Sequence, residues 1–89
     1  MRVRVRVFGV VQGVGFRYFI REVAESSKLR GWVRNMADGS VEALFDGAEA
    51  DVNRAVEMCR RGPPAAAVDR LEVTRESEAQ ALFGFRITY

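Results

Sequence analysis

The sequence predicts an α+β fold in which an antiparallel sheet carries two helices on one of its faces. Two observations lead to this prediction. Apolar residues recur with the two-residue period of a strand in several short segments, and with the 3.6-residue period of a helix in two longer ones. These segments follow one another as strand, helix, strand, strand, helix and strand, with one further short strand at the end. This order is that of the ferredoxin-like βαββαβ sandwich.

The first strand is expected over residues 2–7, where arginine and valine alternate strictly. The valines form an apolar face, and we expect the arginines on the opposite face, Arg2, Arg4 and Arg6, to be solvated. A glycine-rich turn then leads into the first helix. The apolar stripe of this helix recurs at three- and four-residue steps and consists of Phe16, Phe19, Ile20, Val23 and Ala24.

The second helix is expected over residues 48–61, with acidic residues near its start and arginines at its end, as the helix dipole favours. Gly62 and the two prolines after it end this helix. The other strands are expected at residues 32–36, 41–45, 68–74 and 85–89. Asp38-Gly39 predicts a hairpin between the first two of them, because glycine accepts a positive φ. Three aromatic residues are expected to pack in or against the core: Trp32, Phe83 and Phe85.

Composition and charge narrow the classes of function. The 89 residues carry 14 Lys and Arg against 12 Asp and Glu, and a net charge of +2 attracts nucleic acid or an anionic membrane only weakly. This length supports one core, and so a single domain over residues 1–89. One cysteine, Cys59, and no histidine exclude an internal disulfide and argue against a metal site. No apolar run has the ~18 residues of a membrane span, so we expect a cytoplasmic protein.

The glycine-rich turn between the first strand and the first helix, Gly9 to Gly15, is a candidate anion site. Its three glycines allow successive backbone N–H groups to point into one concavity beside the positive end of the helix dipole. Arg17 follows at the start of the helix, where its planar guanidinium can hold two oxygens of a phosphoryl group. The alternatives are a purely structural turn and a solvated arginine. A glycine-rich turn alone would favour the first, and an arginine without that turn would favour the second.

Asn35 is the second candidate, because it ends a strand just before the hairpin. Its side-chain amide donates and accepts hydrogen bonds at once, which suits the positioning of a water molecule. The alternative is a turn-forming asparagine that bonds its own backbone.

Two segments of the chain resemble the signature sequences of the acylphosphatase family: VQGVGFR at residues 11–17, and GWVRN at residues 31–35 followed by DGSVE at 38–42. The resemblance extends to Gly62-Pro63 and to the closing residues 85–89, so it covers essentially the whole chain. It implies hydrolysis of acyl phosphates, the mixed anhydrides of a carboxylic acid and phosphate, without metal or cofactor. The products are a carboxylate and inorganic phosphate, which is also an expected inhibitor.

The resemblance also implies roles for individual residues. Arg17 binds the phosphoryl group together with the backbone of the turn, and Asn35 orients the attacking water. The residues implied to bind phosphate are Gln12, Gly13, Val14, Gly15, Phe16 and Arg17. The chain departs from the family pattern at Lys28, where a glycine is usual at the end of the first helix. A left-handed conformation at Lys28 costs about 1 kcal/mol relative to glycine.

Two other functions stay open for this fold: a non-catalytic phosphate-binding domain and an RNA-binding module. An RNA-recognition motif carries its aromatic residues on a central strand, whereas Phe16 and Phe19 belong to a helical stripe here. The expected partner is therefore a small acyl phosphate. We expect neither nucleic acid nor a membrane as a partner, and we expect the protein to be a monomer.

Overall fold

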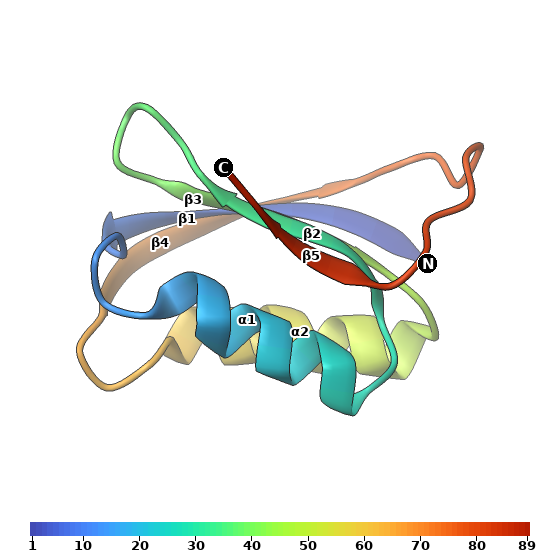
Figure 1. The fold of residues 1–89 in the computed structure, drawn as a ribbon, viewed down its shortest axis with the longest axis horizontal. Coiled ribbons are helices and arrows are strands. Elements are labelled where there is room, and N and C mark those ends of the chain that lie inside the picture. Colours follow the sequence, from blue (N-terminus) through green and yellow to red (C-terminus); the bar gives the residue numbers. More distant parts are fainter.

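A computed structural model describes all residues, 1–89, and shows two layers: a five-stranded sheet and two helices packed on one of its faces (Figure 1). The elements in chain order are β1 (Arg2–Val10), α1 (Phe16–Ser26), β2 (Arg30–Asn35), β3 (Val41–Asp46), α2 (Glu49–Arg61), β4 (Ala67–Arg75) and β5 (Phe85–Thr88). The predicted ferredoxin-like arrangement is confirmed, with every element within a few residues of its expected bounds. Neither helix has the length and hydropathy needed to cross a membrane.

The strands lie in the order β4-β1-β3-β2-β5, and the first four are antiparallel to their neighbours. β5 differs from the expected antiparallel sheet, because it pairs with β2 in parallel, Phe85 opposite Gly31. The cause is the path of the chain. β4 ends at the same end of the sheet at which β2 begins, so a segment that crosses directly to the far edge continues alongside β2 in the same direction (Figure 1).

The core lies between the sheet and the two helices. β1 contributes the valines of its alternating pattern, and each helix contributes the buried side of its stripe. The buried residues of the two helices are Phe16, Ile20, Ala24, Val52, Ala55, Val56 and Cys59. β3, at the centre of the sheet, is buried along its whole length. The two-residue and 3.6-residue patterns of the sequence therefore converge on one apolar layer.

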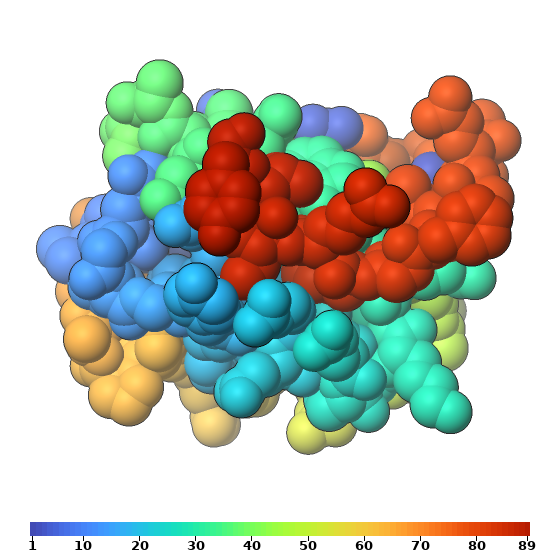
Figure 2. All heavy atoms as spheres, in the orientation of Figure 1, coloured from blue at the N-terminus to red at the C-terminus, as the bar shows by residue number.

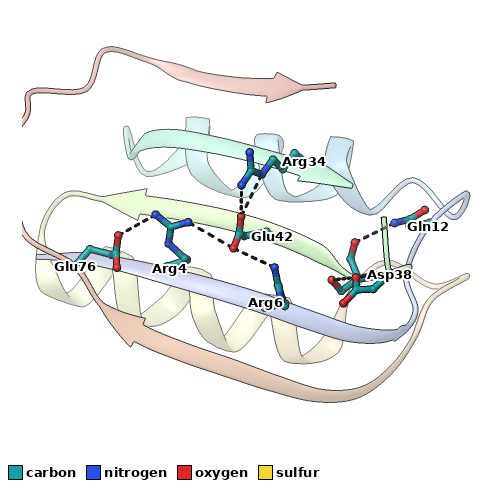
Figure 3. A network of polar contacts seen from close by, with 8 residues as sticks. Arg4, Arg6, Gln12, Arg34, Asp38, Glu42 and Glu76 are labelled. Carbon is teal, nitrogen blue, oxygen red and sulfur yellow. Dashed lines mark hydrogen bonds and ion pairs between the residues drawn. The ribbon is translucent and has the colours of Figure 1, made fainter. Parts of the chain in front are cut away.

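The other face of the sheet carries a network of ion pairs whose arginines stay partly exposed (Figure 3). The Glu42 carboxylate, whose side chain is only 6% exposed, is the common acceptor. Its oxygens lie 2.8 Å from Arg34, 3.5 Å from Arg4 and 3.7 Å from Arg6. The expectation of a solvated basic row on β1 therefore holds only in part. Arg4 and Arg6 keep about a third of their side chains exposed but pair with a carboxylate from β3, whereas Arg2 is buried.

Arg2 is buried, and its bonds hold segment 76–84 over the open face of the sheet. Its Nε donates to Asp46 Oδ1 at 3.3 Å, and its other nitrogens donate to the carbonyls of Ser77 and Gln80. Phe83, on the same segment, is 82% exposed, so the expectation that it packs against the core was wrong. The reason is that arginine–carbonyl bonds, not aromatic packing, tie this segment down.

Lys28, two residues after the end of α1, has a left-handed backbone with a φ of 55°. The Lys28 N–H donates to the Glu25 carbonyl at 3.2 Å, and the Leu29 N–H donates to the Ala24 carbonyl at 2.8 Å. These two bonds form a Schellman motif, which usually places glycine at the left-handed position. The chain here uses a lysine, and buried Leu29 packs directly after it.

Candidate active site

The loop between β1 and α1, residues 11–15, curls because two of its glycines adopt left-handed backbone angles. φ is 74° at Gly13 and 79° at Gly15, a region that residues with a side chain rarely adopt. Buried side chains at Val11 and Phe16 hold the two ends of the loop. Replacing either glycine would therefore strain the backbone, although open space surrounds both of them.

The backbone amides of residues 12–18, in this loop and at the start of α1, have no partner among the turn and loop hydrogen bonds of the chain. Twelve backbone hydrogen bonds lie outside the helices and strands, and residues 12–18 donate none of them. Gly15 caps the helix without a side-chain bond, and no acidic residue stands in the first turn. This arrangement leaves the positive end of the helix dipole and a row of donors available to an anion.

Arg17 lies in the first turn of α1, half-buried, and forms no ion pair with any carboxylate of the chain. Its only close polar or aromatic contact is with Tyr89, whose ring centre lies 4.9 Å from the guanidinium carbon. Figure 2 shows the C-terminal residues, in dark red, against the start of α1. A guanidinium stacked on a ring keeps its planar set of N–H donors available for phosphoryl oxygens.

Asn35 is the last residue of β2 and is exposed. Its side chain makes no hydrogen bond within the chain, in contrast to the alternative of a turn-forming asparagine. It lies at the same cavity as Arg17, about 160 Å³ in volume. This cavity is lined by Val11, Gly13, Gly15, Phe16, Arg17, Tyr18 and Asn35. The structure thus brings together a cation and unpaired amides from residues 11–18 with the free amide side chain of Asn35 from the end of β2.

Two of the predicted phosphate-binding residues do not line this cavity. The Gln12 side chain turns away from it and donates to the carbonyls of Met36 and Ser40 at 2.7 Å and 3.0 Å. Val14 is half-buried and packs against the core. At both positions only the backbone N–H remains available to an anion.

A larger hollow of about 540 Å³ lies elsewhere, between the sheet and segment 78–84. Its charged walls are already paired, since Arg2 and Arg30 both contact Asp46. The smaller cavity at Arg17 is the one whose donors are unpaired, and for this reason it is the better candidate for a substrate.

No three His, Cys, Asp or Glu side chains lie close enough to hold a metal ion. Cys59 is fully buried in α2, and this burial raises the pKa of its thiol to about 12. The thiol is therefore protonated at neutral pH and is no nucleophile.

The RNA-binding alternative is not favoured by the positions of the aromatic residues. Phe16 is buried and meets Phe19 edge-on, with ring centres 6.0 Å apart, on the side of α1 that faces the core. Neither ring is free to stack on a base.

Comparisons with known proteins agree on one family. The family model described as Acylphosphatase matches residues 3–87. An acylphosphatase from Caldivirga maquilingensis is 49% identical over 90 residues, which cover 100% of this chain and 95% of the relative. The crystal structure of acylphosphatase from Bacillus subtilis is 41% identical, has a TM-score of 0.95, and matches over 99% of this chain and 98% of that one.

The same fold also occurs within a much longer protein. The crystal structure of full-length HypF in the phosphate- and nucleotide-bound form is 28% identical, with a TM-score of 0.84, over 99% of this chain but 12% of the HypF chain. This similarity therefore concerns a small part of HypF.

Sequence reasoning missed two neighbours of the cavity, Tyr18 and Tyr89. Tyr18 follows Arg17 directly, so its place in the first turn was a usable signal. Tyr89 reaches Arg17 only because β5 lies beside β2, next to α1, and no local pattern reports such a contact.

Proposed function

The chain belongs to the acylphosphatase family and hydrolyses acyl phosphates, and we propose that Arg17 and the loop amides hold the phosphoryl group while Asn35 orients the attacking water. The observation that carries this proposal is the lining of one small cavity by Arg17, Asn35 and the glycine-rich loop. The amides of residues 12–18 make none of the backbone hydrogen bonds found in turns and loops, and the side chains of Arg17 and Asn35 make no hydrogen bond within the chain.

In the proposed reaction, the phosphoryl oxygens accept hydrogen bonds from the amides of residues 12–17 and from the Arg17 guanidinium. The water accepts a hydrogen bond from Asn35 Nδ2 and donates one to Asn35 Oδ1, which aims its lone pair at phosphorus. The new P–O bond forms as the bond to the acyl oxygen breaks, and the carboxylate leaves with the electron pair. Both protons of the water end on the released phosphate, which forms as H2PO4⁻ and equilibrates with solvent.

Such a site needs no general acid, because the leaving carboxylate has a pKa near ~4 and departs unprotonated. Phosphoryl transfer depends chiefly on positioning and on stabilising charge on the phosphoryl oxygens, which amides and a guanidinium supply. No cluster of metal-ligating side chains adjoins this cavity. We therefore propose metal-independent catalysis and expect full turnover in EDTA.

The test is hydrolysis of benzoyl phosphate, in EDTA, by the parent and by Arg17→Ala and Asn35→Ala. Arg17→Ala is expected to lose detectable turnover and to weaken inhibition by phosphate, since the guanidinium bears on charge in the transition state. Asn35→Ala is expected to lower kcat with little change in KM, since the water is not part of substrate binding. Wild-type turnover in either variant would refute the role of that residue.

The second helix offers matched controls for both substitutions. Arg54 and Asn53 are neighbours on α2, both exposed, and neither lines the cavity at Arg17. Arg54→Ala and Asn53→Ala are expected to leave kcat and KM unchanged.

The remaining features of the proposal concern partners and location. We propose that phosphate inhibits as the product, that the chain acts as a monomer in the cytoplasm, and that it does not bind nucleic acid. The last point is supported by the ion pairs of the sheet face, where Glu42 and Asp46 neutralise the arginines that would otherwise form a basic stripe.

A further inference from the structure

The Gln12 side chain connects the two halves of the proposed site. Its Nε2 donates to the Met36 carbonyl at 2.7 Å and to the Ser40 carbonyl at 3.0 Å. These are the only hydrogen bonds between the loop of residues 11–15 and residues 35–40. Figure 3 shows Gln12 beside the β2–β3 hairpin, which also contains Asp38.

The two carbonyls that accept from Gln12 close the hairpin loop. Met36 N–H donates to the Ser40 carbonyl at 2.8 Å, so Gln12 joins a bond that already links the two ends of this loop. Ser40 is buried, at 2% exposure, whereas residues 37–39 are exposed. Gln12 therefore holds the base of the hairpin and not its exposed tip.

Asn35 stands one peptide bond before Met36, and its own side chain makes no hydrogen bond within the chain. Its position consequently depends on its backbone alone. On one side this backbone pairs with β3, Asn35 opposite Val41, and on the other it continues into the peptide that Gln12 holds. A misplacement of about 1 Å in a reacting geometry can cost on the order of 100-fold in rate.

We propose that the Gln12 side chain is a positioning residue that sets Asn35 at the distance from the phosphate-binding loop at which its water attacks phosphorus. This inference rests on the proposed role of Asn35. It assigns Gln12 two separate tasks: its backbone N–H faces the anion with the other loop amides, and its side chain holds the hairpin. Loss of the side-chain bonds should therefore affect the chemical step more than phosphate binding.

The test is steady-state hydrolysis of benzoyl phosphate by Gln12→Met, which keeps the length of the side chain but cannot donate. We expect kcat to fall about tenfold, while KM and the inhibition constant of phosphate stay within about twofold. Gln12→Leu, which also removes the donor, is expected to behave alike and serves if Gln12→Met does not fold. Val10→Ala, at an exposed position just before the loop that does not line the cavity, is the control with unchanged kcat.

A double-mutant cycle separates positioning from a general loss of structure. In the Asn35→Ala background, Gln12→Met is expected to lower kcat by less than twofold, because the residue it positions is gone. Amide hydrogen exchange gives a second readout, with faster exchange expected at Met36 and unchanged exchange in β3.

Two results would overturn the inference: an unchanged kcat, whether or not phosphate inhibition weakens, or an equal loss of kcat in both backgrounds. These outcomes differ from failure of the proposed function, in which Asn35→Ala itself keeps wild-type turnover.

Discussion

The guanidinium carbon of Arg17 lies 4.9 Å from the centre of the Tyr89 ring, although the two residues stand far apart in the sequence. Tyr89 is 95% exposed, so this contact lies at the surface of the protein. A carboxylate in the same place would occupy the N–H donors of Arg17 and neutralise its charge. The ring restricts the side chain and does neither, which suits a residue that binds an anion.

Replacement of Tyr89 should therefore weaken substrate binding without abolishing catalysis. A cation–π contact at an exposed site contributes about 0.5–1 kcal/mol, so Tyr89→Ala is expected to raise KM about two- to fivefold. Tyr89→Phe keeps the ring and should keep the KM of the parent. Phe83→Ala removes an exposed ring that does not line the cavity at Arg17, and it is the control. Equal KM values for Tyr89→Ala and the parent would contradict a role for the stack.

Lys28→Gly is expected to stabilise the fold. Lys28 adopts a φ of 55°, and relief of this strain gives about 1 kcal/mol, or a rise of roughly 4–8 °C in Tm for a chain of this size. Ser27→Gly is the matched control, because Ser27 has a φ of −107° and glycine there only adds flexibility to the unfolded chain. Thermal unfolding followed by circular dichroism checks both variants, and a lower Tm for Lys28→Gly would rule out strain at this position.

Asp38 should stabilise the hairpin in a pH-dependent way. The Ser40 hydroxyl and the Ser40 backbone N–H both donate to Asp38 Oδ1, and these bonds hold the pKa of the Asp38 carboxyl below its usual value. A carboxyl whose pKa is lower in the folded state contributes stability above its unfolded pKa, about 4, and loses it as the pH falls through the folded value.

The difference in urea midpoint between the parent and Asp38→Ala is accordingly expected at pH 7 and should shrink below about pH 4. Ser40→Ala removes the hydroxyl donor, so the pKa of Asp38, measured by NMR titration, should rise toward its usual value in that variant. The backbone donor remains there, so the recovery is partial. A midpoint difference that stayed constant from pH 7 to pH 2 would argue against this interpretation.

Glu42→Gln should be the most damaging single change on the open face of the sheet. It leaves Arg4, Arg6 and Arg34 without their shared carboxylate, at a cost of about 2 kcal/mol. This lies below the value for a fully buried pair, because the three arginines are each about a third or more exposed.

Salt gives this prediction a distinctive signature. The three arginines repel one another in Glu42→Gln, so added salt should reduce the loss of stability measured by urea unfolding. Glu57→Gln, which breaks an exposed pair with Arg60 on α2, is expected to cost only a few tenths of a kcal/mol. A similar cost for the two variants would mean that the buried position of Glu42 is of no consequence.

Features that depend on neighbours in the chain could be predicted from the sequence alone. The alternation of arginine and valine in β1, the stripe of α1 and the stop at Gly62 each depend on residues a few positions apart. The glycine-rich loop before Arg17 and the strand end at Asn35 are local in the same sense. For this reason the helices, the strands and the candidate site residues could be predicted from the sequence.

Tertiary structure decided which distant segments of the chain contact one another. The parallel direction of β5, the pairing of Glu42 with three arginines and the stack of Tyr89 on Arg17 all join segments distant in the sequence. No periodicity encodes such contacts, because each depends on how strands are ordered in the sheet. The Gln12 side chain shows the difference most clearly: the motif marks the residue, and only the packing of the loop beside the β2–β3 hairpin shows that its amide binds Met36 and Ser40.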